Sequence, residues 1–324
     1  MNRRRALLLA AGAALAAPCL AFAQAVRKVT VLFAGDPDED ESAARAFFDE
    51  MGRLGWREGA NISYERLTGR GTREYVEKLA AIAASDEPNL IFATTGTTAL
   101  AATKERRSLP IVFVTASDPA ATGLVASLAR PGANATGVYQ HREEAVAKRF
   151  ELVRETFPQL KRIGIVLDRL ASEFQRQRAA YLEAARRAEL EPVAGEFANY
   201  EAVARVLSEF RKGGITVAAV TPSFTLFARR REVCNAALFQ RIALVAHRSD
   251  WVEAGAVLSY GVDVAESLRQ AAAIADRILR GARPAEIRVA EPSKFELAVN
   301  LPSAKRLGLT IPQGVRGLAD RVIA

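Results

Sequence analysis

From Lys28 onward, short β-branched runs alternate with stretches whose apolar residues recur at helical spacing. The strand-like runs of the first half cover residues 29–33, 62–66, 90–94, 111–115 and 136–139. Between the first two, Phe47, Met51 and Leu54 mark one face of a helix. This alternation is the sequence sign of parallel sheets covered by helices, so we predict an α/β fold.

The same alternation starts again after residue 142. Helices are expected over 143–156, 174–188, 200–210 and 227–238, and strands at 163–167, near Val193, and at 217–220, 243–246 and 256–260. A helix over 264–279, the run 294–300 and two short helices around 303–307 and 315–323 complete the chain. No low-complexity linker separates the halves. We therefore predict two lobes joined by strands, an arrangement that closes by a defined rotation.

The first 23 residues have the pattern of a signal peptide. Arginines at positions 3–5 precede an apolar run over 6–20 that is short for a membrane span. Small residues at Ala21 and Ala23 predict cleavage after Ala23 and export to the periplasm. A twin-arginine signal also fits Arg4-Arg5. Cys19 suggests a lipid anchor, but Pro18 stands where that signal needs a small residue.

The remaining chain is long enough for two domains. The formal net charge is +8, and the arginines are scattered among acidic residues rather than gathered in a basic block. Nucleic-acid binding is therefore not indicated. A positive balance favours anionic solutes, or it reflects only a solvated, arginine-rich surface. After cleavage Cys234 is the one cysteine left, so no intramolecular disulfide is expected.

Three stretches carry a resemblance to a known family. The first reads FVTASDP at 113–119 and continues as TGLVASLARPGANATGV at 122–138. The second is AGAVLSYG at 254–261, and the third combines ILRGARP at 278–284, FELAVN at 295–300 and AKRLGLTIP at 304–312. Together they resemble the ABC transporter substrate-binding proteins, whose better-studied relatives bind tryptophan and other aromatic amino acids.

That resemblance implies a type I periplasmic-binding-protein fold, with two doubly wound parallel-sheet lobes joined by a three-crossover hinge. The crossovers would lie near residues 138–139, 261–263 and 291–292. Lobe 1 would then comprise residues 24–138 plus 263–291, and lobe 2 residues 139–262 plus 292–324.

Candidate ligand-binding residues lie on the loops that follow the strands. In open parallel α/β sheets, ligands bind beyond the carboxyl ends of the strands, where helix N-termini present backbone N–H groups. In the first lobe the candidates are Phe33, Gly35, Thr95, Gly96, Thr97, Ser117 and Asp118. In the second they are Asp168, Arg169, Thr221, Ser223, Phe224, His247 and Arg248, with Tyr260 at the hinge.

Several of these polar candidates have two interpretations. Small hydroxyls beside glycine make residues 95–97 the preferred anion cradle, although Thr97 alternatively only caps its helix. Asp118 either accepts a hydrogen bond from a ligand amine or is a turn residue before Pro119. Arg169 and Arg248 either pair with a ligand carboxylate or are solvated.

The aromatic candidates also have two interpretations. Phe33, Phe224 and Tyr260 either wall the cleft and stack on a planar ligand or pack under loops. Trp251 follows a strand exit in an expected helix and is predicted to belong to the core.

The sequence gives little support for catalysis. It has no G-x-G-x-x-G after the first strand, no Walker loop and no G-x-S-x-G elbow. With His141 and His247 as its two histidines, neither a metal centre nor a Cys-His pair is indicated. His247, Ser249 and Asp250 are too close in sequence to converge as a triad.

We therefore predict a non-enzymatic, monomeric binding protein without a cofactor, which captures a small polar or aromatic solute, either an amino acid or a related carboxylate. The resemblance implies an ABC permease and ATPase as partners. The alternative is an exported sensor that presents the same fold to a membrane receptor. One chain does not fix side-chain directions, so the sequence leaves the solute unnamed.

Overall fold

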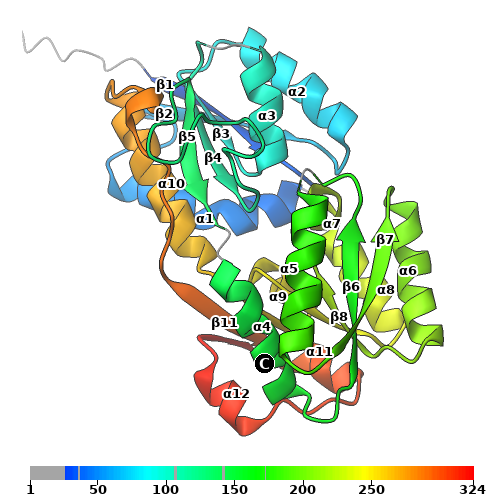
Figure 1. Ribbon diagram of the computed structural model, residues 1–324. Helices are drawn as coiled ribbons and strands as arrows, with labels where there is room; N and C mark the ends of the chain where they lie inside the picture. Colours follow the sequence, from blue (N-terminus) through cyan, green and yellow to red (C-terminus); the bar gives the residue numbers. More distant parts are fainter. Residues whose placement is uncertain (1–25, 36, 106–107, 141–142, 172) are drawn as a thin grey trace, which may run out of the picture.

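The computed structural model describes residues 26–35, 37–105, 108–140, 143–171 and 173–324. The predicted signal peptide and its cleavage site lie outside these residues, as does His141. Figure 1 shows two lobes, each a β-sheet with helices on both faces, which confirms the predicted fold class. Within the described part of the chain, no helix is long and apolar enough to cross a membrane.

The sheet of lobe 1 has five parallel strands in the order β2-β1-β3-β4-β5. Helices cover both of its faces, so strands such as β4 are buried along their whole length. Thr115 pairs with Tyr139, so this sheet reaches one residue past the predicted limit of lobe 1. The strand bounds are β1 Arg27–Phe33, β2 Ile62–Thr68, β3 Leu90–Ala93, β4 Ile111–Thr115 and β5 Ala135–Tyr139.

Two helix pairs cover this sheet. Helices α1 (Pro37–Arg53) and α10 (Val264–Leu279) pack together on one face, where Phe47 stacks on Phe92. Helices α2 (Arg73–Ser85) and α3 (Gly96–Glu105) cover the other face. Although α10 follows lobe 2 in sequence, its apolar residues belong to the core of lobe 1, and Figure 1 shows it against the first sheet.

The sheet of lobe 2 has seven strands in the order β12-β11-β10-β9-β8-β6-β7. Only β10 and β11 pair antiparallel, because the chain re-enters this lobe from the other side after α10. The strand bounds are β6 Arg162–Asp168, β7 Glu191–Phe197, β8 Val217–Val220, β9 Ala243–Ala246, β10 Leu258–Val262, β11 Phe295–Asn300 and β12 Arg321–Ile323.

Helices α4 (Glu143–Thr156) and α5 (Phe174–Arg187) cover one face of this sheet. The other face carries α6 (Glu201–Lys212), α7 (Phe224–Ala228), α8 (Arg230–Phe239) and α9 (Asp250–Ala254). Trp251 in α9 is fully buried, as predicted, and Cys234 in α8 is 1% exposed. The single helix expected over 227–238 is wrong: Arg229 has φ −127°, which ends α7 and begins α8.

The C-terminal prediction is partly wrong. Helices α11 (Leu301–Arg306) and α12 (Gln313–Leu318) are present, but residues 321–323 form β12 rather than the end of a helix. Ala319 is extended, and the Asp320 carboxylate accepts a hydrogen bond from Leu297 N–H at 2.9 Å. These contacts turn the chain so that β12 pairs parallel with β11.

The chain passes between the lobes after β5, after β10 and after the 3₁₀ turn Pro284–Glu286. The second and third passages are tied together: Asp263 N–H donates to Lys294 O at 2.9 Å, and Lys294 Nζ lies 2.9 Å from Asp263 Oδ2. Burial alone would raise the pKa of Asp263, but hydrogen bonds from Lys294 and Glu266 N–H outweigh it and lower that pKa. The domain limits given above remain a prediction.

Candidate functional site

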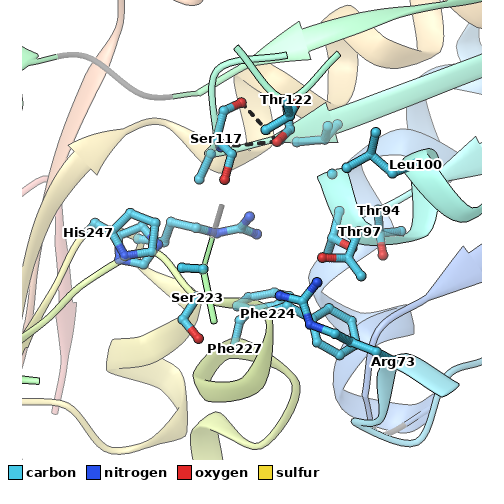
Figure 2. Close-up of a pocket in the computed structure, with 18 residues that line it drawn as sticks. Arg73, Thr94, Thr97, Leu100, Ser117, Thr122, Ser223, Phe224, Phe227 and His247 are labelled. Atoms are coloured by element: carbon cyan, nitrogen blue, oxygen red, sulfur yellow. Dashed lines mark hydrogen bonds between the residues drawn. The ribbon is translucent and has the colours of Figure 1, made fainter. Parts of the chain in front are cut away.

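A cavity of about 100 Å³ lies between the lobes, beyond the carboxyl ends of strands in both sheets. In Figure 2, Thr94, Thr97 and Leu100 face the cavity from lobe 1, and Ser223, Phe224, Phe227 and His247 face it from lobe 2. The position is the one that strand order dictates for an open α/β sheet.

The N-terminus of α3 forms one wall. Thr95 caps this helix: its Oγ1 accepts from Thr98 N–H at 3.2 Å, and its own N–H donates to Thr98 Oγ1 at 3.1 Å. The alternative role of Thr97 as the cap is therefore wrong, and its half-buried side chain lines the cavity instead. A Cβ at Gly96 would lie 2.6 Å from Thr115 Oγ1, so the close approach of α3 to β4 requires glycine.

The loop after β4 supplies a second wall through Thr115, Ala116, Ser117 and Thr122. Thr115 Oγ1 accepts from Ser117 N–H at 3.1 Å, which folds the loop back on its own strand. Asp118 follows this wall, but Oδ1 accepts from the N–H groups of Ala120 and Ala121 at 2.9 and 3.1 Å. Asp118 is therefore a turn residue before Pro119, which was the second of its two interpretations.

Lobe 2 contributes a short helix whose start is fixed by two hydrogen bonds. Ser223 Oγ accepts from Leu226 N–H at 3.2 Å and donates to Asp168 Oδ2 at 2.7 Å. This arrangement places Ser223, Phe224 and Phe227 on the cavity wall. Asp168 itself is 1% exposed and accepts a further bond from Leu170 N–H at 2.9 Å.

Arg248 is the cation of the lobe 2 wall, and its side chain is 12% exposed. Its Nη2 lies 2.6 Å from Asp250 Oδ2, and its Nη1 donates to Gln140 Oε1 at 3.0 Å. The guanidinium carbon lies 4.6 Å from the centroid of the Phe227 ring, a cation–π geometry. Asp250 is thus paired with Arg248, which leaves it unsuited to orient His247.

Arg73 lines the cavity from the first turn of α2, and the sequence interpretation missed it. It lies on the connection that follows β2. Applying the strand-exit rule to the run 62–66, as to the other strands of lobe 1, would have found it.

Eight of the fifteen candidates line the cavity: Thr95, Gly96, Thr97, Ser117, Ser223, Phe224, His247 and Arg248. The remaining seven lie elsewhere. Phe33 is 2% exposed in the core of lobe 1, and Thr221 is fully buried with Oγ1 bonded to Val166 O at 3.0 Å. Tyr260 stacks on Phe295, with ring centroids 5.7 Å apart.

Of the other four, Asp118 and Asp168 accept the local hydrogen bonds described above. The Arg169 side chain is exposed to solvent. Gly35 lies against the backbone of Ala228, so it takes part in the contact between the lobes rather than in the cavity wall.

Two contacts between the lobes border the cavity. The apolar seam joins Ala34, Val76, Ala80 and Ala101 of lobe 1 to Phe224, Phe227 and Ala228 of lobe 2. The polar seam joins Asp118 and Tyr139 of lobe 1 to Glu173 and Arg176 of lobe 2.

In the polar seam, Asp118 N–H donates to Glu173 Oε2 at 2.9 Å. Arg176 Nη1 lies 3.6 Å from Asp118 Oδ2, and Nη2 donates to the Tyr139 hydroxyl at 3.2 Å. Burial raises the pKa of Tyr139 to about 12, which the hydrogen bond from Arg176 only partly offsets. Tyr139 therefore stays neutral across the physiological range.

A metal centre finds no support among the residues that the structure describes, where no three His, Cys, Asp or Glu side chains are grouped to hold an ion.

Comparisons with known proteins agree with this arrangement. A tyrosine-binding protein of Clostridioides difficile (strain R20291) is 24% identical over 269 residues, which cover 83% of this chain and 77% of that protein. A conserved domain protein from Vibrio cholerae superposes with a TM-score of 0.81 at 23% identity, covering 92% of this chain and 99% of the other.

Two further solved structures differ in their ligand state. A domain from Streptococcus pneumonia in complex with L-Trp gives a TM-score of 0.82 at 20% identity over 92% of this chain and all of that one. A ligand-free, open substrate-binding protein from Clostridium difficile gives 0.65 at 25% identity, with the same coverage. Residues 28–323 match the family described as ABC transporter substrate binding protein. The chain belongs to the ABC transporter substrate-binding protein family.

Proposed function

We propose that this protein is exported to the periplasm, captures a small solute in the interlobe cavity and delivers it to an ABC permease that works with an ATPase. The observation that carries the proposal is the cavity itself, which is walled by both lobes. A ligand held by groups of both lobes has a higher affinity for the closed arrangement, and this difference drives closure. No catalytic role is part of the proposal.

The closed form presents one continuous surface across the two seams, and this is the form that would dock on the permease. The solute is proposed to be an amino acid or a related carboxylate. Two features support it: the first turn of α3, which lines the cavity through Gly96 and Thr97, and a tyrosine-binding relative and an L-Trp-bound structure of the same fold.

A thermal-shift screen of amino acids, carboxylates and sugars tests the proposal. A solute that binds the native state at about 100 times its Kd stabilises it by about 2.7 kcal/mol, which is readily detected as a raised Tm. Solution scattering should show that the same solute makes the protein more compact.

A cavity-blocking variant locates the binding site. Ser117→Trp places an indole in the cavity and should abolish the thermal shift, whereas Ser85→Trp, on the exposed end of α2, should keep it. A full thermal shift in Ser117→Trp, or a scattering profile that does not change in saturating solute, would contradict the proposal.

A further inference from the structure

The charges that face the cavity all have one sign. Among the described residues that line it, Arg73 and Arg248 carry charge, and none is an aspartate or glutamate. An α-amino acid presents both an ammonium group and a carboxylate, and a buried ammonium group needs an anionic or multiply accepting partner. Among the described residues, the wall therefore offers charged partners to a carboxylate and no charged partner to an ammonium group.

Arg73 is an exposed cation of this wall, and no carboxylate of the described residues balances its charge. In Figure 2 it extends beside the Phe224 ring, and its guanidinium carbon lies 5.8 Å from the centroid of that ring. Its one protein hydrogen bond among the described residues is a long one, from Nη2 to Leu170 O at 3.4 Å. No carboxylate of the described residues pairs with it. A ligand carboxylate would therefore supply the missing counter-ion.

Arg248 differs because Asp250 neutralises it. Its Nε is nevertheless buried and has no hydrogen-bond partner among the described residues. The buried Nε is not on the cavity surface, so Arg73 supplies the net positive charge that a ligand meets.

No carboxylate lines the cavity among the described residues, and the two acidic candidates have other partners. Asp118 accepts two backbone N–H groups and faces Arg176, and Asp168 accepts from Ser223 and Leu170. Asp118 was the residue that the sequence offered to a ligand amine, and Asp168 was the other acidic candidate. With both engaged, an ammonium group inside the cavity would meet the two guanidinium groups without a compensating anion.

The rest of the wall fits a flat apolar body. Phe224 and Phe227 present rings, and Leu100 and Val114 present aliphatic groups. A cavity of about 100 Å³ is of the same order as the engineered cavity of about 150 Å³ that admits benzene. One aromatic ring with a short acidic arm is the matching shape.

Resting on the proposed function, we infer that the solute is an aromatic carboxylate without an α-amino group, held by Arg73 and by the first turn of α3. The ring lies against Phe224 and Phe227, and the carboxylate completes the charge balance of Arg73.

Calorimetry with two matched series tests this inference in the wild-type protein. The first series is phenylacetate, L-phenylglycine and phenylacetamide, and the second is 3-phenylpropanoate, L-phenylalanine and 3-phenylpropanamide. In each series the second member adds an ammonium group and the third removes the negative charge. The carboxylate is expected to accept a charge-assisted hydrogen bond from Arg73. It should therefore bind roughly tenfold to a hundredfold more tightly than either companion in at least one series.

Arg73→Gln should weaken carboxylate binding by about tenfold or more and leave the carboxamide unaffected. Arg169→Gln is the matched control, since Arg169 is exposed at a neighbouring strand exit and does not line the cavity. The inference is overturned if the amino acid binds as tightly as its carboxylate in both series, or if Arg73→Gln weakens all three members of a series equally.

The two proposals fail in different ways. If a sugar or an amino acid stabilises the protein while both aromatic carboxylates do not, the inference is wrong and the proposed function stands. If no solute of the wider screen binds, both are wrong.

Discussion

The apolar seam and the polar seam connect the same two lobes with different chemistry. Phe224, Phe227 and Ala228 of the apolar seam are each less than 10% exposed. In the polar seam Arg176 remains 43% exposed, although Glu173 is only 8% exposed. Burying one phenylalanine contributes roughly 1.5–3 kcal/mol, whereas an ion pair open to solvent contributes about 0–1 kcal/mol. The apolar seam therefore carries most of the free energy of closure.

The polar seam instead fixes the relative orientation of the two lobes. Its bond from Asp118 N–H to Glu173 joins the loop after β4 to the start of α5, and so fixes how the lobes meet. Directional bonds of this kind select one closed arrangement among several that the apolar contacts alone would tolerate. The comparison predicts that substitutions in the apolar seam change solute affinity strongly and that substitutions in the polar seam change it weakly.

The largest effect is expected from Gly35→Ala. A Cβ at this position would lie 2.9 Å from the carbonyl carbon of Ala228 and closer still to its oxygen. Both partners are backbone atoms, so no side chain can rotate to relieve the clash, and the contact joins the two lobes. Solute affinity should fall by at least about 100-fold, measured by calorimetry with the solute that stabilises the wild type most.

Gly52→Ala is the control for this substitution, because a Cβ at that helical position meets nothing within 4 Å. Circular dichroism should show both variants folded. If Gly35→Ala binds the solute normally and scattering shows it compacting, then Gly35 does not limit closure.

The second-largest effect on solute affinity is expected from Phe227→Ala. Phe227 is 8% exposed in the apolar seam, and its ring also supports the guanidinium of Arg248. Loss of the roughly 1.5–3 kcal/mol of free energy that burial of this ring contributes should weaken solute binding by about tenfold to a hundredfold. Phe239→Ala removes a ring that is 85% exposed and should leave affinity unchanged. Equal affinities for these two variants would show that the seam is not the source of closure energy.

Much of this arrangement follows from the sequence. Strand order puts the carboxyl ends of β3 and β4 at one edge of the first sheet and those of β8 and β9 at one edge of the second, so their exit loops could be named from periodicity alone. Thr97, Ser223 and Arg248 were found in this way. Arg73 was missed because the exit of β2 was not considered, although the same rule applies to it.

Two of the candidates that do not line the cavity were predicted at the correct strand ends, but their side chains point away from the cavity. Phe33 ends β1, but the pleat of the strand turns its ring into the core beside Phe92. Asp168 stands at the exit of β6, yet a hydrogen bond from Ser223, fifty-five residues later, holds its carboxylate away from the cavity. Such tertiary bonds join residues far apart in the chain, and no local pattern predicts them.

The smallest effect is expected from Arg176→Met, which keeps an unbranched side chain of similar helix propensity but removes the charge. The contacts with Asp118 and Glu173, at 3.6 and 3.4 Å, are partly exposed and therefore weak. Solute affinity should fall by at most about fivefold, and the difference from wild type should shrink between low salt and about 1 M salt because ions screen the pair.

Arg187→Met on the same helix is the control, since Arg187 pairs only with Glu183 within α5 among the described residues. It should bind like the wild type at every salt concentration. A loss for Arg176→Met that matches that of Phe227→Ala and persists at high salt would reverse the comparison, because the polar seam would then supply the energy of closure as well as its geometry.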